Sequence, residues 1–500
     1  MRCAPLRPPV RACLVALAAV ASLAAKPNIV LIVADDLGYA ELGCQGAKDL
    51  PTPRIDSIAA GGVRFTNGYV TAPVCCPSRA GFLTGRMQTR FGHERNAIGV
   101  QNLDAEIGLP LDQATLADLL KPAGYKTALV GKWHLGAHPT RRPHRRGFDE
   151  FFGFLNEGHY YVPQPYEGVW TWLRIAKNPY GAWNRLQVGP FVFSDHMGSD
   201  EPTYDLENPL RRGDDPVSEP EYLTDALARE AVDFIDRNKR DPFFLYLAFN
   251  APHSPMQAAD AYMERFRDIE DIHRRIFVSM VANLDDAVGR VLDKLEAEGL
   301  TEDTLIFFLS DNGGPTKELT SSNAPLREGK GQVYEGGLRV PFLAQWKGRW
   351  PEGKIDARPA SSLDIVPTAL AAAGAPLPDG LDGVDLTPWL TGERNENPHD
   401  VLFWRYIQRI ALRRGDWKVV ARYDAERGPH ELELYNLAAD LGETTDLAAR
   451  EPERLETLRR LLGEYDAQMV DSLWGADPRS RSTRTNVPLE ALREAEPARR

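Results

Sequence analysis

Uniformly apolar runs of strand length recur along this chain. Five of them are flanked by turn residues, and none alternates clearly between apolar and polar positions: Ile29–Ala34, Thr127–Val130, Phe243–Phe249, Thr304–Leu309 and Val340–Ala344. Such runs are typical of strands that are buried on both faces of a largely parallel sheet. A buried helix segment is the alternative for any single run, but the shared length and the flanking turns favour strands.

Helical periodicity fills the stretches between these runs. Apolar residues recur every three or four positions in Leu116–Leu120, in Ala226–Ile235 and in the longer stretch Phe277–Leu295. Each of these patterns predicts an amphipathic helix. Strands that alternate with helices predict an α/β fold, a three-layer sandwich with helices on both faces of a large, mostly parallel sheet.

The pattern changes from about residue 395. Four short apolar runs with turns between them predict an antiparallel sheet, at Val401–Trp404, Ile410–Arg413, Lys418–Tyr423 and Glu431–Tyr435. A final helix, which carries apolar residues from Leu455 to Met469, is expected to pack on that sheet. We therefore expect a large domain over 26–394, a smaller α+β subdomain over 395–478 and a polar tail over 479–500.

Residues 137–220 are rich in aromatic side chains but weak in periodicity. Their aromatic residues include Phe151, Phe152, Phe154, Tyr160, Tyr161, Trp170, Trp172, Tyr180 and Trp183. We expect long surface insertions packed over the edge of the sheet. Such rings either stack on sugar rings or, more often, bury a small core of the insertion itself.

The N-terminus has the pattern of a secretory signal peptide over residues 1–25. Arg2, Arg7 and Arg11 precede an apolar run from Cys13 to Ala25, and Ser22-Leu23-Ala24 offers a cleavage site of small residues. The apolar run is too short to span a bilayer. The pattern predicts export to the periplasm or the extracellular space with no membrane span after cleavage, while an amphipathic leader or short anchor is the alternative reading.

Composition narrows the class of function. The chain is 43% hydrophobic and 26% charged, which is typical of a globular protein, and its formal net charge is -12. An acidic chain is a poor partner for nucleic acid, and a polyanionic substrate would need a local basic patch. After signal removal only Cys44, Cys75 and Cys76 remain, so there is no disulfide framework. Cys44 and Cys76 could be free thiols or one bridge.

Polar side chains follow four of the predicted strands. Asp35-Asp36 ends the first, Lys132 and His134 follow the second, Asn250 and His253 the third, and Asp311-Asn312 the fourth. Ligands of open α/β sheets bind beyond the carboxyl ends of the strands, so these groups are expected to gather at one edge. In an extended chain, Lys132 and His134 would also point to the same side.

Hard oxygen donors dominate this set. Asp35, Asp36, Asp311 and Asn312 suit calcium or magnesium, and calcium is favoured because its loose geometry tolerates several protein oxygens. Paired acidic residues at strand ends can also be plain turn and N-cap residues. Downstream, Arg327, Lys330 and Arg339 lie among glycines, and a glycine-rich loop that carries cations favours close approach of an anion.

The segment Cys75–Arg86 carries the most specific motif. It reads C-x-P-S-R-x-x-x-L-T-G, with Pro77 suited to the first turn of a helix and Arg79 near the positive end of that helix. An anion near residue 75 would meet both the helix dipole and a guanidinium. The motif resembles the signature of the formylglycine-dependent, type I sulfatases of the alkaline-phosphatase-like superfamily. Further segments that resemble successive motifs of that family are Pro27–Tyr39, Gly131–Gly136, Asn250–Pro255, Leu309–Gly314, Leu326–Pro341, Asp385–Thr391 and Leu434–Asp446.

The resemblance implies a fold, a cofactor and a set of roles. It implies an alkaline-phosphatase-like sandwich, one calcium ion, and oxidation of Cys75 to formylglycine (3-oxoalanine) by a maturation enzyme. The implied metal ligands are Asp35, Asp36, Asp311, Asn312 and the modified Cys75. The implied sulfate cradle is Arg79, Lys132, His134, His253 and Lys330.

The same resemblance implies a mechanism. A hydroxyl of the hydrated aldehyde at residue 75 would attack sulfur in line, with Asp311 as its base. His253, with Lys330, would protonate the departing alcohol, and His134 would take the proton of the second hydroxyl so that sulfate is expelled.

The implied activity is hydrolysis of sulfuric esters. The signal peptide and the aromatic-rich insertions favour a sulfated carbohydrate, of a galactose or N-acetylgalactosamine type, and an aryl sulfate is the other expected substrate. A phosphonate or phosphodiester hydrolase of the same superfamily and a non-catalytic binder of sulfated glycans are the alternatives.

Overall fold

A ten-stranded sheet forms the centre of the molecule in the computed structural model, which describes residues 26–174, 186–194, 208–316, 319–424 and 428–475. The strands run in the order β10-β9-β5-β4-β11-β1-β13-β14-β2-β15. Their bounds are β1 (Asn28–Ala34), β2 (Val63–Phe65), β4 (Lys126–Lys132), β5 (Glu150–Phe154), β9 (Arg211–Arg212), β10 (Asp215–Pro216), β11 (Phe243–Ala248), β13 (Thr304–Ser310), β14 (Phe342–Gln345) and β15 (Lys354–Asp356).

The middle of the sheet is parallel and its borders are mixed. β5, β4, β11, β1 and β13 pair in parallel, with Val30 opposite both Leu245 and Ile306. The predicted strand over Val340–Ala344 exists as β14 but runs antiparallel to β13. The sheet is therefore parallel across its middle, where four of the five uniformly apolar runs lie.

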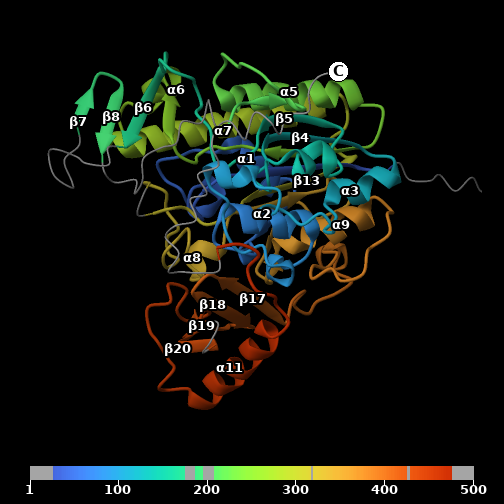
Figure 1. The fold of residues 1–500 in the computed structure, drawn as a ribbon, viewed down its shortest axis with the longest axis vertical. Coiled ribbons are helices and arrows are strands. Elements are labelled where there is room, and N and C mark those ends of the chain that lie inside the picture. The colour runs from blue at the N-terminus through green and yellow to red at the C-terminus, as the bar shows by residue number, and fades with distance from the viewer. Residues whose placement is uncertain (1–25, 175–185, 195–207, 317–318, 425–427, 476–500) are drawn as a thin grey trace, which may run out of the picture.

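Helices cover both faces of this sheet, as predicted (Figure 1). Alternate residues of β1 point to opposite faces, so Val30 and Ile32 enter one hydrophobic core and Ile29 and Leu31 enter another. The first core includes residues of α1 (Pro53–Ala60), α5 (Leu223–Asn238) and α7 (Ile272–Ala297); the second includes residues of α2 (Cys75–Thr84), α3 (Leu116–Leu120) and α9 (Ile365–Ala372). This is the three-layer sandwich that the alternation of strands and helices predicts.

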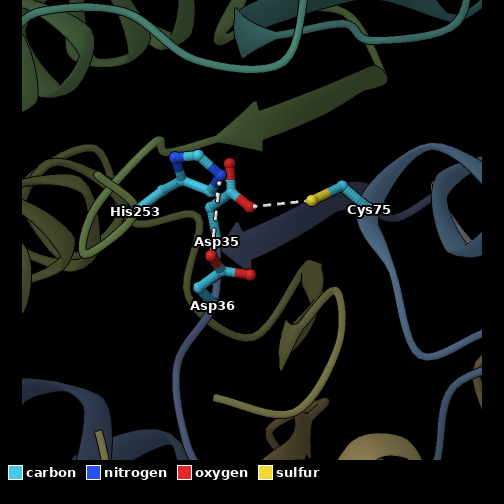
Figure 2. Close-up of side chains that lie close together, drawn as sticks. All are labelled: Asp35, Asp36, Cys75 and His253. Carbon is cyan, nitrogen blue, oxygen red and sulfur yellow. Dashed lines mark hydrogen bonds and ion pairs between the residues drawn. The ribbon is translucent and has the colours of Figure 1, made fainter. Parts of the chain in front are cut away.

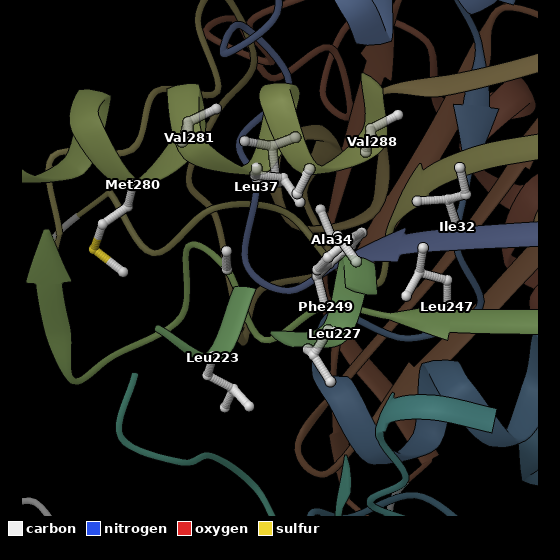
Figure 3. Close-up of a cluster of buried hydrophobic side chains, with 14 of the residues drawn as sticks. Ile32, Ala34, Leu37, Leu223, Leu227, Leu247, Phe249, Met280, Val281 and Val288 are labelled. Carbon is white, nitrogen blue, oxygen red and sulfur yellow. The ribbon is translucent and has the colours of Figure 1, made fainter. Parts of the chain in front are cut away.

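The first core shows how the sandwich is closed (Figure 3). Leu247 of β11 and Ala34 of β1 face Leu227 of α5 and Val288 of α7, and all four side chains are fully buried. Each such apolar side chain contributes roughly 1.5–3 kcal/mol relative to an exposed one. The core therefore holds the ends of β1 and β11 rigidly, and these ends carry the polar groups described below.

The interpretation of residues 137–220 as surface insertions is partly wrong. Phe151, Phe152 and Phe154 belong to β5, a strand of the main sheet, and are 4%, 3% and 0% exposed. Gly153, with a φ of 154°, interrupts the apolar alternation there and hides the strand from a periodicity search. A second sheet, of order β12-β6-β8-β7, contains β6 (Val169–Arg174), β7 (Leu186–Val188), β8 (Phe191–Ser194) and β12 (Met256–Ala259).

The aromatic residues of this region mainly form cores. Trp172 and Tyr161 are 1% exposed, and Tyr161 stacks on Tyr222. This burial favours the small-core alternative over sugar stacking for these rings. Tyr180 and Trp183 lie outside the described residues.

The C-terminal part forms its own antiparallel sheet, which projects from the sandwich in Figure 1. Its strands are β17 (Val401–Tyr406), β18 (Arg409–Arg414), β19 (Trp417–Asp424) and β20 (Gly428–Asn436), and α11 (Pro452–Asp466) packs on it. Met469 lies beyond the end of that helix but packs against the same apolar cluster. The remaining short elements are β3 (Gly68–Tyr69), β16 (Ala360–Ser361), α6 (Asp260–Arg265), α8 (Glu335–Leu338) and α10 (Thr387–Leu390).

Two expectations concern segments at the termini. The predicted signal peptide, residues 1–25, and the polar tail from 479 lie outside the described residues. Within the described ranges, no helix combines the length and apolar character needed to cross a membrane.

Candidate active site

Four neighbouring strands of the sheet deliver their polar ends to one edge. In the order β4, β11, β1 and β13, the strands are followed by Lys132 and His134, by Asn250 and His253, by Asp35-Asp36, and by Asp311-Asn312. All of these side chains are buried except His253, which is 11% exposed. Polar groups buried together at the carboxyl ends of strands mark a ligand site in open α/β sheets.

Helix α2 brings Cys75 to this edge (Figure 2). Cys75 is the first helical residue, Pro77 lies in the first turn, and Sγ of Cys75 lies 3.6 Å from Oδ1 of Asp35. The thiol is 1% exposed. Burial alone would raise the pKa of Cys75, but the charges of Lys132 and Lys330 outweigh burial and lower it to about 7.

The acidic residues and the amide form one connected set. The backbone N–H of Asp36 donates to Oδ1 of Asp311 at 3.2 Å, and Nδ2 of Asn312 donates to Oδ1 of Asp36 at 2.7 Å. The other amide atom, Oδ1 of Asn312, is buried without a partner. Buried polar atoms are rarely left unpaired, so this lone pair indicates a missing ligand.

Two lysines neutralise these carboxylates. Nζ of Lys132 lies 2.5 Å from Oδ2 of Asp35, and Nζ of Lys330 lies 2.7 Å from Oδ2 of Asp36. Lys132 is fully buried, whereas the Lys330 side chain is 22% exposed. Burial would raise the pKa of Asp36, but the charges of Lys330 and His253 lower it to about 2.

Arg79 uses most of its N–H groups within the protein, and its Nη2 also lies 3.6 Å from Oδ2 of Asp35. Its Nε and Nη2 donate to Oδ2 of Asp311 at 3.0 and 2.7 Å, and its Nη1 donates to the carbonyl of Lys132 and the hydroxyl of Tyr246. Arg79 therefore orients Asp311 in this structure. Burial, together with the charge of Asp35, raises the pKa of Asp311 to about 6.

The two histidines have opposite environments. His134 is fully buried; its Nε2 donates to the carbonyl of Ala97 at 2.9 Å, and its Nδ1 has no partner. Burial and the charge of Lys132 lower the pKa of His134 well below its usual value. His253 lies 3.5 Å from Oδ2 of Asp36, and although burial opposes it, the charges of Asp35 and Asp36 raise its pKa to about 9.

The chain is not extended at His134, so the expectation that Lys132 and His134 share a side because of an extended backbone is wrong. His134 has a φ of 55°, in the left-handed region. The backbone turns there, and His134 reaches the site through its contact with Ala97.

The glycine-rich loop packs directly on the end of β13. A Cβ atom at Gly313 would lie 1.7 Å from the carbonyl oxygen of Gly336, and the N–H of Gly313 donates to the carbonyl of Gly337. Only glycine permits this close approach, which places Lys330 beside Asp36.

Some site residues gave no recognisable signal in the sequence. Tyr246 lies inside an apolar strand, and its hydroxyl accepts from Arg79 at 3.0 Å. The backbone N–H of Cys76 donates to Oδ1 of Asn96, and Sγ of Cys76 lies 2.9 Å from Nε2 of His93. The signal that could have identified Tyr246 is its own hydroxyl, a polar group within an otherwise apolar run. Cys44, Cys75 and Cys76 are all free thiols in the described structure, so Cys44 and Cys76 form no bridge.

The donor set fits a hard cation. Ligand atoms of Asp35, Asp36, Cys75 and His253 lie within 4.8 Å of one another, and Asp311 and Asn312 are hydrogen-bonded to Asp36. Carboxylate oxygens, with the unpaired amide oxygen of Asn312, suit calcium better than a soft metal.

Comparisons with known proteins agree with this geometry. Residues 27–375 match the family model described as Sulfatase, and residues 329–467 match the model described as N-sulphoglucosamine sulphohydrolase, C-terminal. Human arylsulfatase A is 36% identical over 488 residues, which cover 90% of both chains.

Two further similar proteins have names that include a carbohydrate. Canine N-acetylgalactosamine-6-sulfatase is 34% identical over 406 residues, which cover 78% of this chain and 71% of the relative. A solved structure described as Ps i-CgsB in complex with k-i-k-neocarrahexaose is 35% identical, has a TM-score of 0.77 and covers 91% of this chain and 95% of its own.

Proposed function

This chain belongs to the sulfatase family and has sulfuric ester hydrolase activity, and from that premise we propose that it is an exported, calcium-dependent sulfatase of sulfated carbohydrates with a formylglycine at position 75. The observation that carries the proposal is that Sγ of Cys75 lies 3.6 Å from Asp35 and within electrostatic range of Lys132 and Lys330. We also propose the division into a signal peptide (1–25), a catalytic domain (26–394), a C-terminal subdomain (395–478) and a polar tail.

The cofactors would be held by the groups already described. Asp35, Asp36, Asp311 and Asn312, with the modified Cys75, would bind calcium, which supplies positive charge against the sulfuryl oxygens. The aldehyde at residue 75, when formed and hydrated, supplies a hydroxyl nucleophile that a thiol cannot replace. The position of the Cys75 sulfur shows where the hydroxyl oxygens of the hydrated aldehyde would lie.

Charge neutralisation is the role of the lysines. A sulfate monoester is an anion, and Lys132 and Lys330 present two ammonium groups at an otherwise acidic edge. In a buried site such fixed charges act more strongly than in water and require no reorganisation. Arg79, most of whose donors are already used, would hold Asp311 in position to accept a proton.

The different solvent exposure of His253 and His134 assigns a different proton transfer to each histidine. His253 and Lys330 are the partly exposed members of the site, so they lie where the alcohol leaves. Without calcium, the charges of Asp35 and Asp36 raise the pKa of His253 and favour its protonated form, which is the form that a general acid requires. His134 is buried and its lowered pKa keeps the ring neutral; because Nε2 donates to Ala97, Nδ1 keeps a free lone pair that would accept a proton after bond cleavage.

The test is sulfate release by the matured protein from a panel of sulfated galactose and N-acetylgalactosamine sugars. Ion chromatography would detect sulfate, and an aryl sulfate and an aryl phosphate would be assayed in parallel under identical conditions. We expect turnover of at least one sugar sulfate and a strong preference for the aryl sulfate over the phosphate. Preferred hydrolysis of the phosphate, or binding of the sugars without turnover when residue 75 is shown to be modified, would contradict the proposal.

A further inference from the structure

A cavity of about 490 Å³ lies beside the reaction centre. Its walls come from three separate segments: Arg95, Asn96, Ile98 and Gln101 of the chain after α2, the β17–β18 turn at Tyr406-Ile407, and Trp474-Gly475. The cavity therefore lies between the sandwich and the C-terminal sheet. A site shared by two sheets is a common place for a substrate pocket.

A buried arginine fixes these three walls to one another. Arg405 of β17 is ion-paired with Glu94 and with Asp466 of α11, and it donates to the carbonyl of Val470. The Arg405 and Glu94 side chains are 4% and 6% exposed. The cavity is thus formed by anchored segments, and its shape is part of the fold.

Arg95 follows Glu94 in the chain and, unlike the ion-paired Arg405, has an unsatisfied guanidinium nitrogen. Its Nε is buried without a hydrogen-bond partner, and no carboxylate of the described residues lies within ion-pair distance of its guanidinium. Its stem is confined by Gly475, where an added Cβ would lie 2.9 Å from Cδ of Arg95. The chain as a whole has a net charge of -12, so acidic partners are plentiful. A guanidinium that is fixed in position and still has no acidic partner therefore indicates that an anionic ligand is missing.

Trp474 and Tyr406, which also line the cavity, carry a further donor and a hydroxyl. Nε1 of Trp474 is buried without a partner in the described structure, and the ring of Trp474 packs edge-on against His93 at 4.8 Å. The Tyr406 side chain, like Trp474, is only half-buried. Exposed apolar surface is supplied by Ile98, which is 61% exposed. Unpaired donors beside an apolar wall are the features of a carbohydrate site.

The cavity adjoins the reaction centre. Asn96 accepts from the backbone of Cys76, and the carbonyl of Ala97 accepts from His134. Burial raises the pKa of Tyr406, and the charges of Lys330 and Arg95 act against that rise. Tyr406 therefore lies within electrostatic range of both Lys330 at the reaction centre and Arg95 in the cavity.

We propose that this cavity binds the sugar next to the scissile sulfate and that Arg95 recognises a second anionic group on it. The preferred substrate is then a polyanionic glycan, and Arg95 is a specificity-determining residue. Asp104, which also lines the cavity, would accept from sugar hydroxyls. The inference rests on the proposed function, and its test is a binding measurement that does not need turnover.

The test compares Cys75→Ala with Cys75→Ala/Arg95→Gln by calorimetry. The probes are three galactose disaccharides: one sulfated on a single ring, one sulfated on both rings, and one with a single sulfate and a uronic acid. A lost charge-assisted hydrogen bond corresponds to roughly 10- to 100-fold in affinity. We expect Arg95→Gln to weaken the two doubly anionic probes by that factor and the single-sulfate probe at least threefold less, and Arg95→Lys to restore part of the loss.

The control is Arg460→Gln, which removes the same charge from an exposed position on α11 and should change no affinity. Equal weakening of all three probes by Arg95→Gln, or none, would overturn the inference. If Arg95→Gln does not fold, the salt dependence of binding to Cys75→Ala decides: the preference for doubly anionic probes must exist and must fall as sodium chloride rises. Failure of the proposed function is seen separately, as an absence of sulfate release by the matured protein with Arg95 intact.

Discussion

Two buried clusters of opposite charges can be compared in this molecule. One is the active edge, where Asp35, Asp36 and Asp311 face Arg79, Lys132 and Lys330. The other, here called the joint, connects the sandwich to the C-terminal sheet through Glu335, Glu443, Lys418, Arg413 and Tyr69. Both clusters are almost fully buried, and both combine carboxylates with basic side chains.

The joint pairs its charges with one another, although Oε1 of Glu443, which faces Lys418, has no hydrogen bond. Nζ of Lys418 lies 2.9 Å from Glu335 and 3.0 Å from Glu443, and the Tyr69 hydroxyl donates to Glu335 at 2.6 Å. Arg413 donates to the Tyr69 hydroxyl. Lys418 also lies over the ring of Trp404 at 5.7 Å.

The active edge leaves atoms unsatisfied. Oδ1 of Asn312 and Nδ1 of His134 are buried without partners, and Lys330 is partly open to solvent. The same kinds of residue thus produce two outcomes. Where every buried polar group has at least an ionic partner, the charges hold two parts of the chain together. Where lone pairs have no partner of either kind, the site awaits a ligand. Changes at the active edge should therefore reduce rate, and changes at the joint should alter stability.

Cys75→Ala should have the largest effect on rate. Removal of a nucleophile typically costs ~10⁴-fold or more in turnover, while the fold should remain because the change only shortens one buried side chain. Sulfate release and the melting temperature would be measured together. In active protein, peptide mass analysis should find residue 75 about 18 Da lighter than cysteine, as the thiol-to-aldehyde change requires.

The matched control is Cys76→Ala, next in the chain and equally buried, which contacts His93 instead of the acidic set. Cys76→Ala should keep measurable turnover. Turnover that survives in Cys75→Ala would exclude residue 75 as the nucleophile.

Calcium removal should have the next largest effect. Chelation should reduce turnover by ~10³-fold and calcium should restore it, because the site offers oxygen ligands. Calcium at 100 times its Kd should also raise the free energy of unfolding by ~2.7 kcal/mol. Asp35→Asn should lose both responses. Thermal melting with and without calcium would check the second, and identical melting curves would contradict a calcium site.

The sequence predicts the active edge well because its residues are local to strand ends. Asp35-Asp36 and Asp311-Asn312 directly follow apolar runs, so the sheet that explains the runs also places the carboxylates. The motif at Cys75 is similarly local, since one helix turn relates Cys75 to Arg79. Short-range patterns of this kind can be interpreted without knowledge of the tertiary contacts.

The joint and the Arg95 cavity could not be predicted for the same reason. Lys418 meets Glu335 across 83 residues of chain, and Arg405 meets Glu94 across 311. Nothing adjacent to either residue indicates its partner. Strand β5 was missed because Gly153 and neighbouring aromatic residues obscure its alternation, and the antiparallel direction of β14 depends on pairing with β2.

The rate loss caused by mutating each histidine should depend differently on the leaving group of the substrate. His253→Ala should slow hydrolysis of sugar sulfates by ~10²–10³-fold, because a sugar alkoxide needs a proton as it leaves, and should slow an activated aryl sulfate by less than about tenfold. His134→Ala should slow both substrates to a similar extent, since its base role follows bond cleavage. Measured kcat values for an aryl sulfate and a sugar sulfate would decide. A His253→Ala effect that is independent of the leaving group would show that these roles are assigned wrongly.

The smallest effect is expected at the joint, from Glu443→Gln. Burial and the nearby charge of Glu335 raise the pKa of Glu443 from 4.5 to about 7, and Lys418 opposes this only in part. The folded protein therefore binds this proton more tightly than the unfolded chain does. Its contribution to stability is complete below pH 4.5 and is lost as the pH rises to about 7, an effect of ~1–3 kcal/mol.

Glutamine cannot titrate, so Glu443→Gln should remove this loss. The free energy of unfolding of the variant minus that of the parent should increase by ~1–3 kcal/mol between pH 5 and pH 8, measured by urea denaturation in saturating calcium. Glu464→Gln, an exposed change on α11, should give a constant difference over the same range. The rate per folded molecule should stay within about twofold, because Glu443 contacts Lys418 and the backbone of Glu335 and touches no group of the active edge. Parallel stability curves, or a rate that falls with the mutation, would show that the joint belongs to the active edge after all, and the distinction between satisfied and unsatisfied charge clusters would not hold in this molecule.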